Sequence, residues 1–202
     1  NKDYKKWVAD VAALIKSKDK NHLVSIGHEG RIGTESMKIF EEIHDDKNVD
    51  YLTIHIWARN WGWYERPKIE EGFKGVLEKA KNYIEEHVVI AKKQNKPLVI
   101  EEFGFARDGE AFDAVTSTKF RDKYFDFIFS YLPNGKRYQG ALNGVNFWAF
   151  GGKARPIKNQ LFWKKGDDYM GDPPMEEQGL YTVFDRDKST WKVIKRYARS
   201  LK

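Results

Sequence analysis

Lys96-Pro97-Leu98-Val99-Ile100-Glu101-Glu102-Phe103-Gly104 is the stretch of sequence that decides how the rest of the chain is interpreted. Three apolar residues after a proline are followed at once by two glutamates, an aromatic residue and a glycine. A short apolar run of this kind is typical of a strand buried on both faces, as in a parallel sheet. A carboxylate at the end of such a strand is unfavourable unless it is paired, hydrated or used in chemistry. Glu102 is therefore the first candidate for a functional residue.

The two neighbouring glutamates are not expected to act together. Successive side chains of a regular strand point to opposite faces, so Glu101 and Glu102 should diverge. In a barrel, one of them would face the axis and the other the layer between strands and helices. A plain alternative is that one glutamate binds a neighbouring backbone group or arginine while the other is only solvated. Polar residues at the other predicted strand ends favour a functional role for Glu102.

Predicted strands and helices alternate along the chain. Strands are expected over 22–26, 50–57, 96–104 and 144–150, and helices over 4–15, 37–43, 69–91, 116–132 (ended by Pro133-Asn134-Gly135) and 191–201. This alternation indicates a parallel sheet with right-handed crossovers. Doubly wound sheets and (β/α) barrels both place their sites where such strands end. Gly27-His28-Glu29-Gly30 is a poor phosphate loop because its carboxylate would face the phosphate, so a barrel is favoured.

The composition narrows the possible functions of the 202 residues, which are enough for one sizeable domain. Aromatic residues make up 15% of the chain, and several of its 7 tryptophans lie in polar, loop-like contexts. A tryptophan outside a core usually faces a flat ligand or a partner. The formal net charge is +6, but basic residues are interspersed with acidic ones, which argues against a nucleic-acid-binding module. There is no cysteine and hence no disulfide, and no apolar run approaches the roughly 20 residues of a membrane span.

Three residues at two other strand ends fit a sugar-binding site around Glu102. His55 and Trp57 are two residues apart, so they share a face at the end of one strand, and Trp148 ends another. Aromatic faces stack on the C–H groups of a sugar, while imidazole and carboxylate groups hold its hydroxyls. Each of these residues alone would be interpreted as part of the core. Their joint placement favours a site.

These motifs resemble those of clan A glycoside hydrolases. Glu102-Phe103-Gly104 resembles the Glu-aromatic-Gly that ends the seventh strand of these enzymes. His55-Ile56-Trp57 resembles the sixth-strand His-x-Tyr of family 5, and Phe147-Trp148 resembles its eighth-strand tryptophan. Similarity to the β-mannanase branch of family 5 covers nearly the whole chain. The loop motifs that carry it are Gly27-His28-Glu29-Gly30, Trp61-Gly62-Trp63, Gly171-Asp172-Pro173-Pro174 and Glu176-Glu177-Gln178-Gly179.

The resemblance implies a (β/α)8 TIM barrel that cleaves β-1,4-mannosidic bonds in mannan-type polysaccharides as a retaining endo-1,4-β-mannosidase. It implies that Glu102 is the nucleophile that forms a glycosyl-enzyme intermediate. His55 would contact the sugar at the cleavage subsite, Trp148 would lie beneath that sugar, and Glu29 would contact a neighbouring mannose. Trp57 replaces the tyrosine usual in the family, whose hydroxyl commonly bonds the nucleophile; an indole N–H could donate instead. Further candidates for the cleft wall, for which a structural role is equally open, are Arg59, Trp61 and Trp63.

One catalytic residue of the implied mechanism is missing. Retaining glycosidases need two carboxyl groups about 5–5.5 Å apart, and the family's acid/base is the Glu of an Asn-Glu pair ending the fourth strand. The sequence contains no Asn-Glu pair, and its strands resemble strands five to eight. A complete barrel needs around 250 residues. Residues 1–202 are therefore expected to be the C-terminal half of one catalytic domain, with strands one to four and the acid/base in an N-terminal half-barrel polypeptide or in a part of the chain outside these residues.

Two alternatives to a mannanase stay open. One is a β-1,4-glucanase, because mannose and glucose differ at one axial hydroxyl, and the other is a non-catalytic sugar-binding protein. No metal is implied, since the histidines lack the close ligand spacing of a zinc site, and this hydrolysis needs no cofactor. The expected ligand is β-mannan or a manno-oligosaccharide, with no nucleic acid and no membrane as partner. A polymeric substrate implies a secreted, periplasmic or cell-surface protein.

Overall fold

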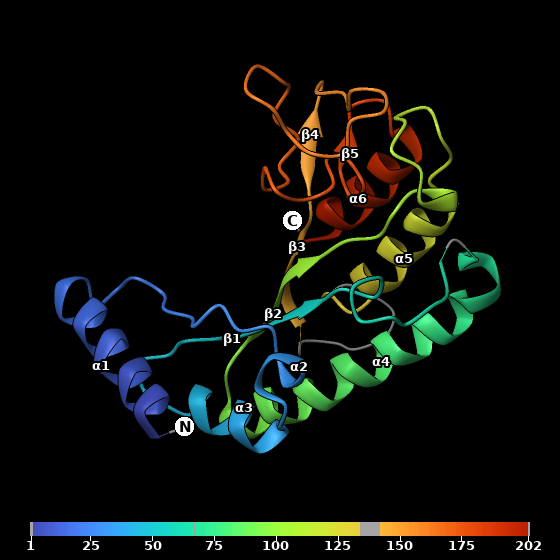
Figure 1. The fold of residues 1–202 in the computed structure, drawn as a ribbon. Coiled ribbons are helices and arrows are strands. Elements are labelled where there is room, and N and C mark those ends of the chain that lie inside the picture. The colour runs from blue at the N-terminus through green and yellow to red at the C-terminus, as the bar shows by residue number, and fades with distance from the viewer. Residues whose placement is uncertain (1, 67, 134–141, 202) are drawn as a thin grey trace.

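Three parallel strands form the central sheet. The computed structural model describes residues 2–66, 68–133 and 142–201. The strands, side by side in this order, are β1 (Leu52–Ile56), β2 (Leu98–Phe103) and β3 (Leu142–Phe147). Both neighbouring pairs are parallel, with Leu98 opposite Leu52 on one side and opposite Leu142 on the other. The carboxyl ends of the strands therefore meet at one edge of the sheet, as the alternation of elements predicts (Figure 1).

Helices follow one side of this sheet and flank its ends. They are α1 (Lys2–Lys18), α2 (Arg31–Thr34), α3 (Met37–His44), α4 (Ile69–Gln94), α5 (Lys119–Phe129) and α6 (Lys188–Ser200), with a short 3-10 helix at Asp108–Glu110. In Figure 1, α3, α4 and α5 run along one side of the sheet, whereas α1 and the loops around β4 stand at opposite ends of the molecule. A second parallel sheet, which the sequence did not predict, pairs β4 (Phe150–Gly152) with β5 (Val183–Phe184).

The core lies between the sheet and the helices α4 and α5. Ile54, Ile100 and Leu142 are fully buried in one apolar cluster with side chains of both helices. α4 ends where Asn95 takes a left-handed backbone conformation (φ 53°), and Pro97 follows two residues later. Both features stop a helix. The chain therefore passes directly from α4 into β2, as predicted.

α5 begins later than the predicted residue 116. The Asp108 carboxylate accepts the backbone N–H groups of Lys119 (3.1 Å) and Phe120 (3.0 Å). This carboxylate satisfies two donors of the first helical turn and so fixes where the helix starts. Of the predicted stop at Pro133-Asn134-Gly135, Asn134 and Gly135 lie outside the described residues.

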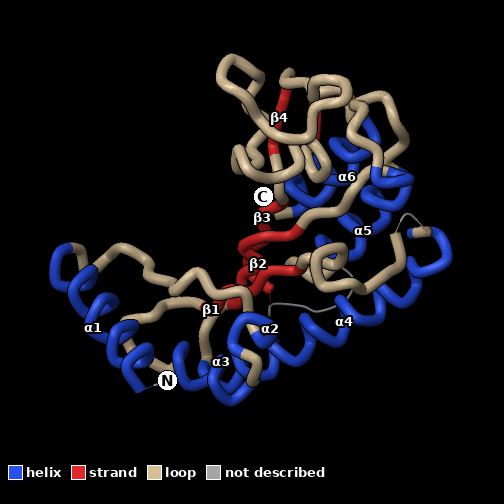
Figure 2. The backbone as a smooth tube through the Cα atoms, viewed as in Figure 1, coloured by secondary structure: helices blue, strands red, loops and turns tan. Residues whose placement is uncertain are grey.

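The prediction of a strand over 22–26 is wrong. This segment runs beside β1 as part of an extended loop (Figure 2). Asp50 donates its backbone N–H to the carbonyl of Val24 (2.8 Å), which is a strand-like contact. The N–H of Val24, however, bonds to the Asp50 carboxylate (2.6 Å), and that of His28 bonds to the Thr53 hydroxyl (2.7 Å). Because side-chain oxygens take these donors, no regular backbone ladder forms.

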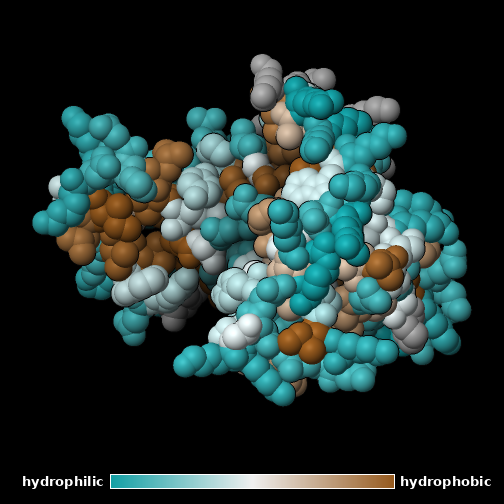
Figure 3. Space-filling view, turned by 90° about the horizontal axis from the view of Figure 1, so that it is seen from above, coloured by the Kyte–Doolittle hydropathy of each residue, from teal (hydrophilic) through white to brown (hydrophobic). Residues whose placement is uncertain are grey.

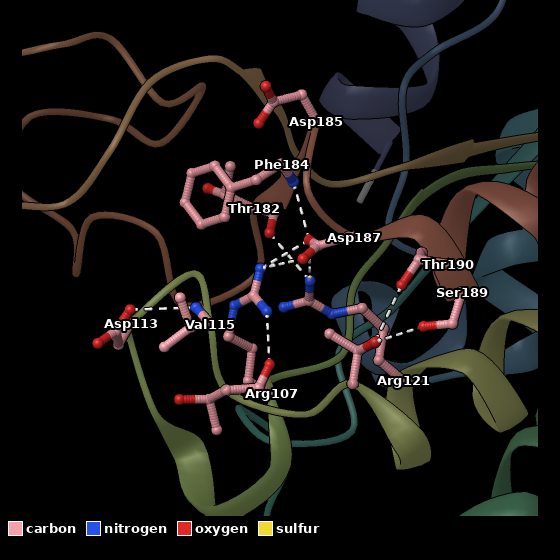
Figure 4. A network of polar contacts seen from close by, with 12 residues as sticks. Arg107, Asp113, Val115, Arg121, Thr182, Phe184, Asp185, Asp187, Ser189 and Thr190 are labelled. Atoms are coloured by element: carbon pink, nitrogen blue, oxygen red, sulfur yellow. Dashed lines mark hydrogen bonds and ion pairs between the residues drawn. The ribbon is translucent and has the colours of Figure 1, made fainter.

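A buried ion network joins α6 to α5 and to the loop after β2 (Figure 4). One nitrogen of Arg107 donates to both carboxylate oxygens of Asp187 (2.7 and 2.6 Å), and a nitrogen of Arg121 lies 3.4 Å from the same carboxylate. The side chains of both arginines are 0% exposed and that of Asp187 is 3% exposed. Burial, together with the nearby Arg107 charge, lowers the pKa of Arg121 to about 9. The carboxylate of Asp187 thus compensates two buried cations.

Two histidines are fully buried and held in their neutral form. Burial lowers the pKa of His44 to about 3 and that of His87 to about 4. His87 Nδ1 donates to the carbonyl of Tyr83 (2.6 Å), and its Nε2 accepts the backbone N–H of Arg31 (2.9 Å). Protonation of Nε2 would remove that acceptor. The fold therefore disfavours the imidazolium form at this position.

Lowering the pH from 6.5 to about 4.5 should reduce the free energy of unfolding of the full-length protein. The folded-state pKa values of His44 and His87 lie below the usual value near 6.5, so the unfolded state binds protons first. Each histidine should contribute about 1.4 kcal/mol per pH unit in this window. Urea unfolding at several pH values measures the slope, which His87→Gln should reduce. His22→Gln, at a side chain that is 73% exposed, is the control and should keep the slope.

One face of α1 leaves apolar side chains uncovered. Val8 and Ala12 are buried against Val24 and Val49. Apolar or aromatic side chains that are 37–68% exposed on this helix and just after it are Tyr4, Trp7, Leu14, Ile15 and Leu23. Figure 3 shows apolar side chains gathered at the end of the molecule where α1 lies. Among the described helices, none is long and apolar enough to cross a membrane.

Candidate active site

The candidate active site lies at the carboxyl ends of β1, β2 and β3. His55 belongs to β1, Glu101 and Glu102 belong to β2, and Trp148 follows β3 directly. Trp148 also donates its backbone N–H to the carbonyl of Phe103 (2.7 Å). This bond holds the start of the loop after β3 beside the end of β2.

The prediction that Glu101 and Glu102 point to opposite faces is wrong. Ile54 is opposite Ile100, but the next residue of β1, His55, is opposite Glu102, so β2 contains one extra residue at this point. An extra residue of this kind is a β-bulge, which interrupts the alternation of side chains and redirects them. Both glutamates consequently reach the same imidazole.

His55 lies between the two carboxylates. Its Nε2 is 3.5 Å from Oε2 of Glu101, and its Nδ1 is 3.2 Å from Oε2 of Glu102. The His55 side chain is 15% exposed, whereas both glutamates are about one third exposed. The backbone N–H of His55 bonds to the carbonyl of Glu29 (3.0 Å). The structure thus brings His55 and Glu102 together, as expected, and adds Glu101 to them.

The side chains of Trp57 and Tyr181 and the backbone carbonyl of Trp148 pack around Gly104, two residues after Glu102. The ring centroid of Trp57 lies 6.0 Å from that of Trp148 and 5.1 Å from that of Tyr181. A Cβ atom at Gly104 would come within 2.9 Å of the Trp57 ring and the Trp148 carbonyl, and within 3.1 Å of the Tyr181 ring. Only glycine leaves room for this arrangement. Gly104 therefore lets the aromatic side chains approach the end of β2.

Gly104→Ala should destabilise the full-length protein by about 1–3 kcal/mol, because the added methyl group overpacks the aromatic cluster. Gly75→Ala is the matched control, since a Cβ at that position of α4 meets nothing within 4 Å. Alanine in a helix interior is favoured over glycine by roughly 0.5–1 kcal/mol, so the control should be neutral or stabilising. Urea unfolding measures both. Equal stability of the two variants would contradict the close packing at Gly104.

Asp172 fixes the indole of Trp148. One carboxylate oxygen accepts the Trp148 indole N–H (3.1 Å), and the other accepts the backbone N–H of Gly179 (2.8 Å) and the hydroxyl of Thr182 (3.1 Å). The residue is 1% exposed. Burial raises the pKa of Asp172, although these three donors oppose the shift. The loop that carries Asp172 therefore orients the side chain predicted to lie beneath a sugar.

Arg59 connects three loops that follow the strands. Its Nε lies 3.2 Å from Glu110, in the 3-10 helix after β2, and its terminal nitrogen lies 2.9 Å from Glu177, in the loop that carries Asp172. The neighbouring Glu176 lies near Glu102: burial raises the pKa of Glu176, and the negative charges of Asp172 and Glu102 add to the rise. Arg59 thus joins the loop after β1 to the two loops that carry Glu110 and Glu177. Its place in the wall of a substrate cleft stays a prediction.

Trp61, Trp63 and Glu29 contact other parts of the fold. Trp61 and Trp63 pack against each other (5.1 Å between centroids) and around Tyr83 of α4 (5.2 and 6.3 Å). The Tyr83 hydroxyl in turn donates to the carbonyl of Glu29 (2.9 Å). The Glu29 side chain lies against Gly33 of α2, within 3.4 Å of where a Cβ would be. These contacts support the structural alternative for the two tryptophans.

Sequence reasoning gave no role to several residues in or beside the candidate site, namely Glu101, Glu110, Asp172, Glu177 and Tyr181. The sequence signals for them are a doubled glutamate at a strand end and the loop motifs Gly-Asp-Pro-Pro at 171–174 and Glu-Glu-Gln-Gly at 176–179. Within the described residues, no three His, Asp or Glu side chains are placed to share a metal ion. The side chains that the structure places at this edge of the sheet are carboxylates, an imidazole and indoles.

A family model described as "GH family 5 beta-mannosidase-like" matches residues 1–202. The chain belongs to glycoside hydrolase family 5. This result confirms the family suggested by the strand-end motifs of this chain.

Curated relatives of this family 5 chain include two plant enzymes. The chain is 26% identical over 162 residues to "Mannan endo-1,4-beta-mannosidase 4" of Solanum lycopersicum, an alignment that covers 73% of this chain and 37% of the relative. It is 25% identical over 195 residues to "Mannan endo-1,4-beta-mannosidase 5" of Arabidopsis thaliana, covering 88% of this chain and 41% of the relative. The chain thus spans less than half the length of either relative.

The chain also matches less than half of each of two solved structures. The family 5 mannosidase of Rhizomucor miehei is 32% identical with a TM-score of 0.82, and the match covers 98% of this chain and 48% of that one. The endo-β-1,4-mannanase of Thermotoga petrophila has a TM-score of 0.62 at 21% identity, covering 96% of this chain and 39% of that one. The fold described here is accordingly that of part of a family 5 (β/α)8 barrel.

Proposed function

We propose that residues 1–202 form the C-terminal part of a retaining endo-glycosidase that cleaves β-1,4-mannosidic bonds in mannan-type polysaccharides. The observation that carries this proposal is the position of Glu102 at a strand end, against His55 and beside Trp148, in a chain of family 5. β1, β2 and β3 would be strands six, seven and eight of the barrel, and the extended segment 22–26 would take the place of strand five. The complete enzyme would then be this chain together with strands one to four and their acid/base glutamate.

Glu102 would act as the nucleophile of a double displacement. Its carboxylate attacks the anomeric carbon while the bond from that carbon to the glycosidic oxygen breaks, and the leaving oxygen takes a proton from the acid/base carboxyl group. A water molecule then gives up a proton to the same acid/base group and attacks the anomeric carbon, which releases Glu102. The first attack inverts the configuration of the anomeric carbon and the second attack inverts it again, so the product keeps the β configuration.

The surrounding side chains would bind and orient the sugar. The indole of Trp148, held by Asp172, offers an aromatic face beneath the reacting mannose. His55 would hold a sugar hydroxyl, and the indole N–H of Trp57, which stands where the family has a tyrosine, would take the place of the tyrosine hydroxyl. Contact between Glu29 and a neighbouring mannose remains a prediction.

The remainder of the barrel would cover surfaces that this chain leaves open. The segment 23–30 lies on the outer side of β1 without a regular ladder, and α1 exposes Trp7 (57%) and Leu14 (58%). Relatives of this chain are more than twice its length. We infer that an N-terminal half-barrel packs against these surfaces. Because the substrate is a polymer, the complete enzyme should act outside the cytoplasm, as a secreted or cell-surface protein.

A second candidate function is exo-cleavage of β-mannosides. The observation that favours it is the higher identity to the Rhizomucor mannosidase (32%), one of whose structures is described as a complex with mannosyl-fructose. An endo-enzyme releases mixed oligosaccharides and rapidly lowers the viscosity of mannan, whereas an exo-enzyme releases mannose one unit at a time.

Product analysis tests the proposal and separates the alternatives. The complete enzyme should be incubated with β-1,4-mannan, mannohexaose and carboxymethylcellulose, and its products should be resolved by chromatography. Mixed manno-oligosaccharides are expected. Mannose as the sole early product would assign exo-cleavage, and faster release from carboxymethylcellulose would assign a β-glucanase. Binding to mannan without any hydrolysis would leave only the sugar-binding alternative.

A further inference from the structure

We propose that Glu101 is a positioning residue that holds the imidazole of His55 against Glu102. This inference rests on the proposed function, since it concerns the environment of the nucleophile. The β-bulge in β2 is the feature that makes it possible, because without the extra residue Glu101 would point away from His55.

Both ring nitrogens of His55 face a carboxylate. Nε2 faces Oε2 of Glu101 at 3.5 Å, and Nδ1 faces Oε2 of Glu102 at 3.2 Å. The Nε2 contact with Glu101 has the geometry of a hydrogen bond, whereas the Nδ1 contact with Glu102 is a close approach. Glu101 therefore orients the ring of His55, with the Nδ1 edge turned toward Glu102.

His55 is the basic side chain that these two carboxylates share. Within the described part of the chain, neither Glu101 nor Glu102 forms an ion pair with a lysine or an arginine. Other titratable groups act on the cluster from neighbouring elements. His28, in the segment beside β1, is close enough to His55 for their charges to interact, and Glu176, in the loop after β4, is close enough to Glu102. Neither of them neutralises the pair of carboxylates.

Glu101 would act on the reaction through His55. The contact between Glu101 and Nε2 fixes the ring plane of His55 and thereby the position of its Nδ1 edge beside the carboxylate that attacks the sugar. The carboxylate of Glu101 lies beside Gly27, which has no side chain. A Cβ atom at Gly27 would be 3.6 Å from Oε2 of Glu101, so this glycine leaves space for the carboxylate.

The separate effects on kcat and KM in the complete enzyme test the role of Glu101. Glu101→Gln keeps the shape of the side chain and replaces the carboxylate that faces His55 with a weaker acceptor. We expect kcat on mannohexaose to fall about tenfold while KM changes little, because the ring orients the reacting groups. Glu65→Gln, at a side chain that is 78% exposed, is the control and should leave both constants unchanged. A loss that appears in KM, or that follows a loss of stability in urea unfolding, would show a purely structural role and would overturn the inference.

A second measurement keeps the inference testable if Glu101→Gln fails to fold. Nitrogen-15 NMR of the wild-type complete enzyme should show hydrogen on Nε2 of His55, the nitrogen that faces Glu101, and hydrogen on Nδ1 alone would overturn the inference. Failure of the proposed function is distinguishable: an enzyme that does not cleave mannan refutes that function. An enzyme that cleaves it, needs Glu102 and keeps its kcat in Glu101→Gln refutes only the role of Glu101.

Discussion

Glu102→Gln in the complete enzyme is expected to reduce kcat on β-1,4-mannan by on the order of 10⁴-fold, or about 5.5 kcal/mol of transition-state stabilisation. Glutamine keeps the volume and one oxygen of the side chain but cannot form the covalent bond to the anomeric carbon. Binding of manno-oligosaccharides, measured by calorimetry, should change little, because the Trp148 platform and its Asp172 partner are untouched.

Glu101→Gln is the informative comparison for this variant. Both glutamates contact the same histidine and have similar exposure, so a general disturbance of the strand end would affect the two variants alike. We expect the loss in Glu102→Gln to exceed the loss in Glu101→Gln by about three orders of magnitude. The reverse order would assign the nucleophile to Glu101, and near-normal turnover of both variants would place the nucleophile elsewhere.

Asp187→Ala is expected to destabilise the full-length protein by about 3–5 kcal/mol, enough to unfold many domains. The substitution leaves the buried guanidinium groups of Arg107 and Arg121 without their shared counter-charge. It also removes the acceptor for the backbone N–H of Phe184 (2.9 Å) in β5. Because this network anchors α6 and β5 behind the loop that carries Asp172, sugar binding should weaken as well. Urea unfolding and calorimetric titration measure the two effects.

Asp185→Ala is the control for this network. Asp185 lies two residues away and pairs with Arg155, but its side chain is 43% exposed, so water can replace the lost contact. Its stability should stay close to that of the unchanged protein. If Asp187→Ala were no more harmful than Asp185→Ala, the buried ion network would contribute nothing to the fold.

The positions of the strand-end residues could be predicted from the sequence because they follow from general rules. Apolar runs separated by helical patterns specify parallel strands, and parallel strands end at one edge. His55, Glu102 and Trp148 therefore had to lie near one another, and the structure brings them together at the ends of β1, β2 and β3. Gly104, as the residue after Phe103, then allows Trp57 to close onto Trp148.

The features that could not be predicted depend on local exceptions to these rules. Regular strand alternation would point Glu101 and Glu102 to opposite faces. No sequence signal predicts the β-bulge that brings both side chains to His55. The absence of a ladder at 22–26 depends on side-chain acceptors such as Asp50, which only the folded backbone brings close. The packing of Trp61 against Tyr83 depends on the path of a loop.

Trapping of the glycosyl-enzyme intermediate tests the central claim most directly. The complete enzyme should be treated with a 2-deoxy-2-fluoro-mannosyl fluoride, which slows hydrolysis of the intermediate more than its formation. All tryptic fragments should then be sequenced by tandem mass spectrometry, including the one that ends at Arg107 and carries Glu101 and Glu102. A fluoromannosyl group attached to Glu102 is the expected result. Attachment to Glu101 or to Glu176, or the absence of any label in an active enzyme, would contradict the assignment of Glu102 as the nucleophile.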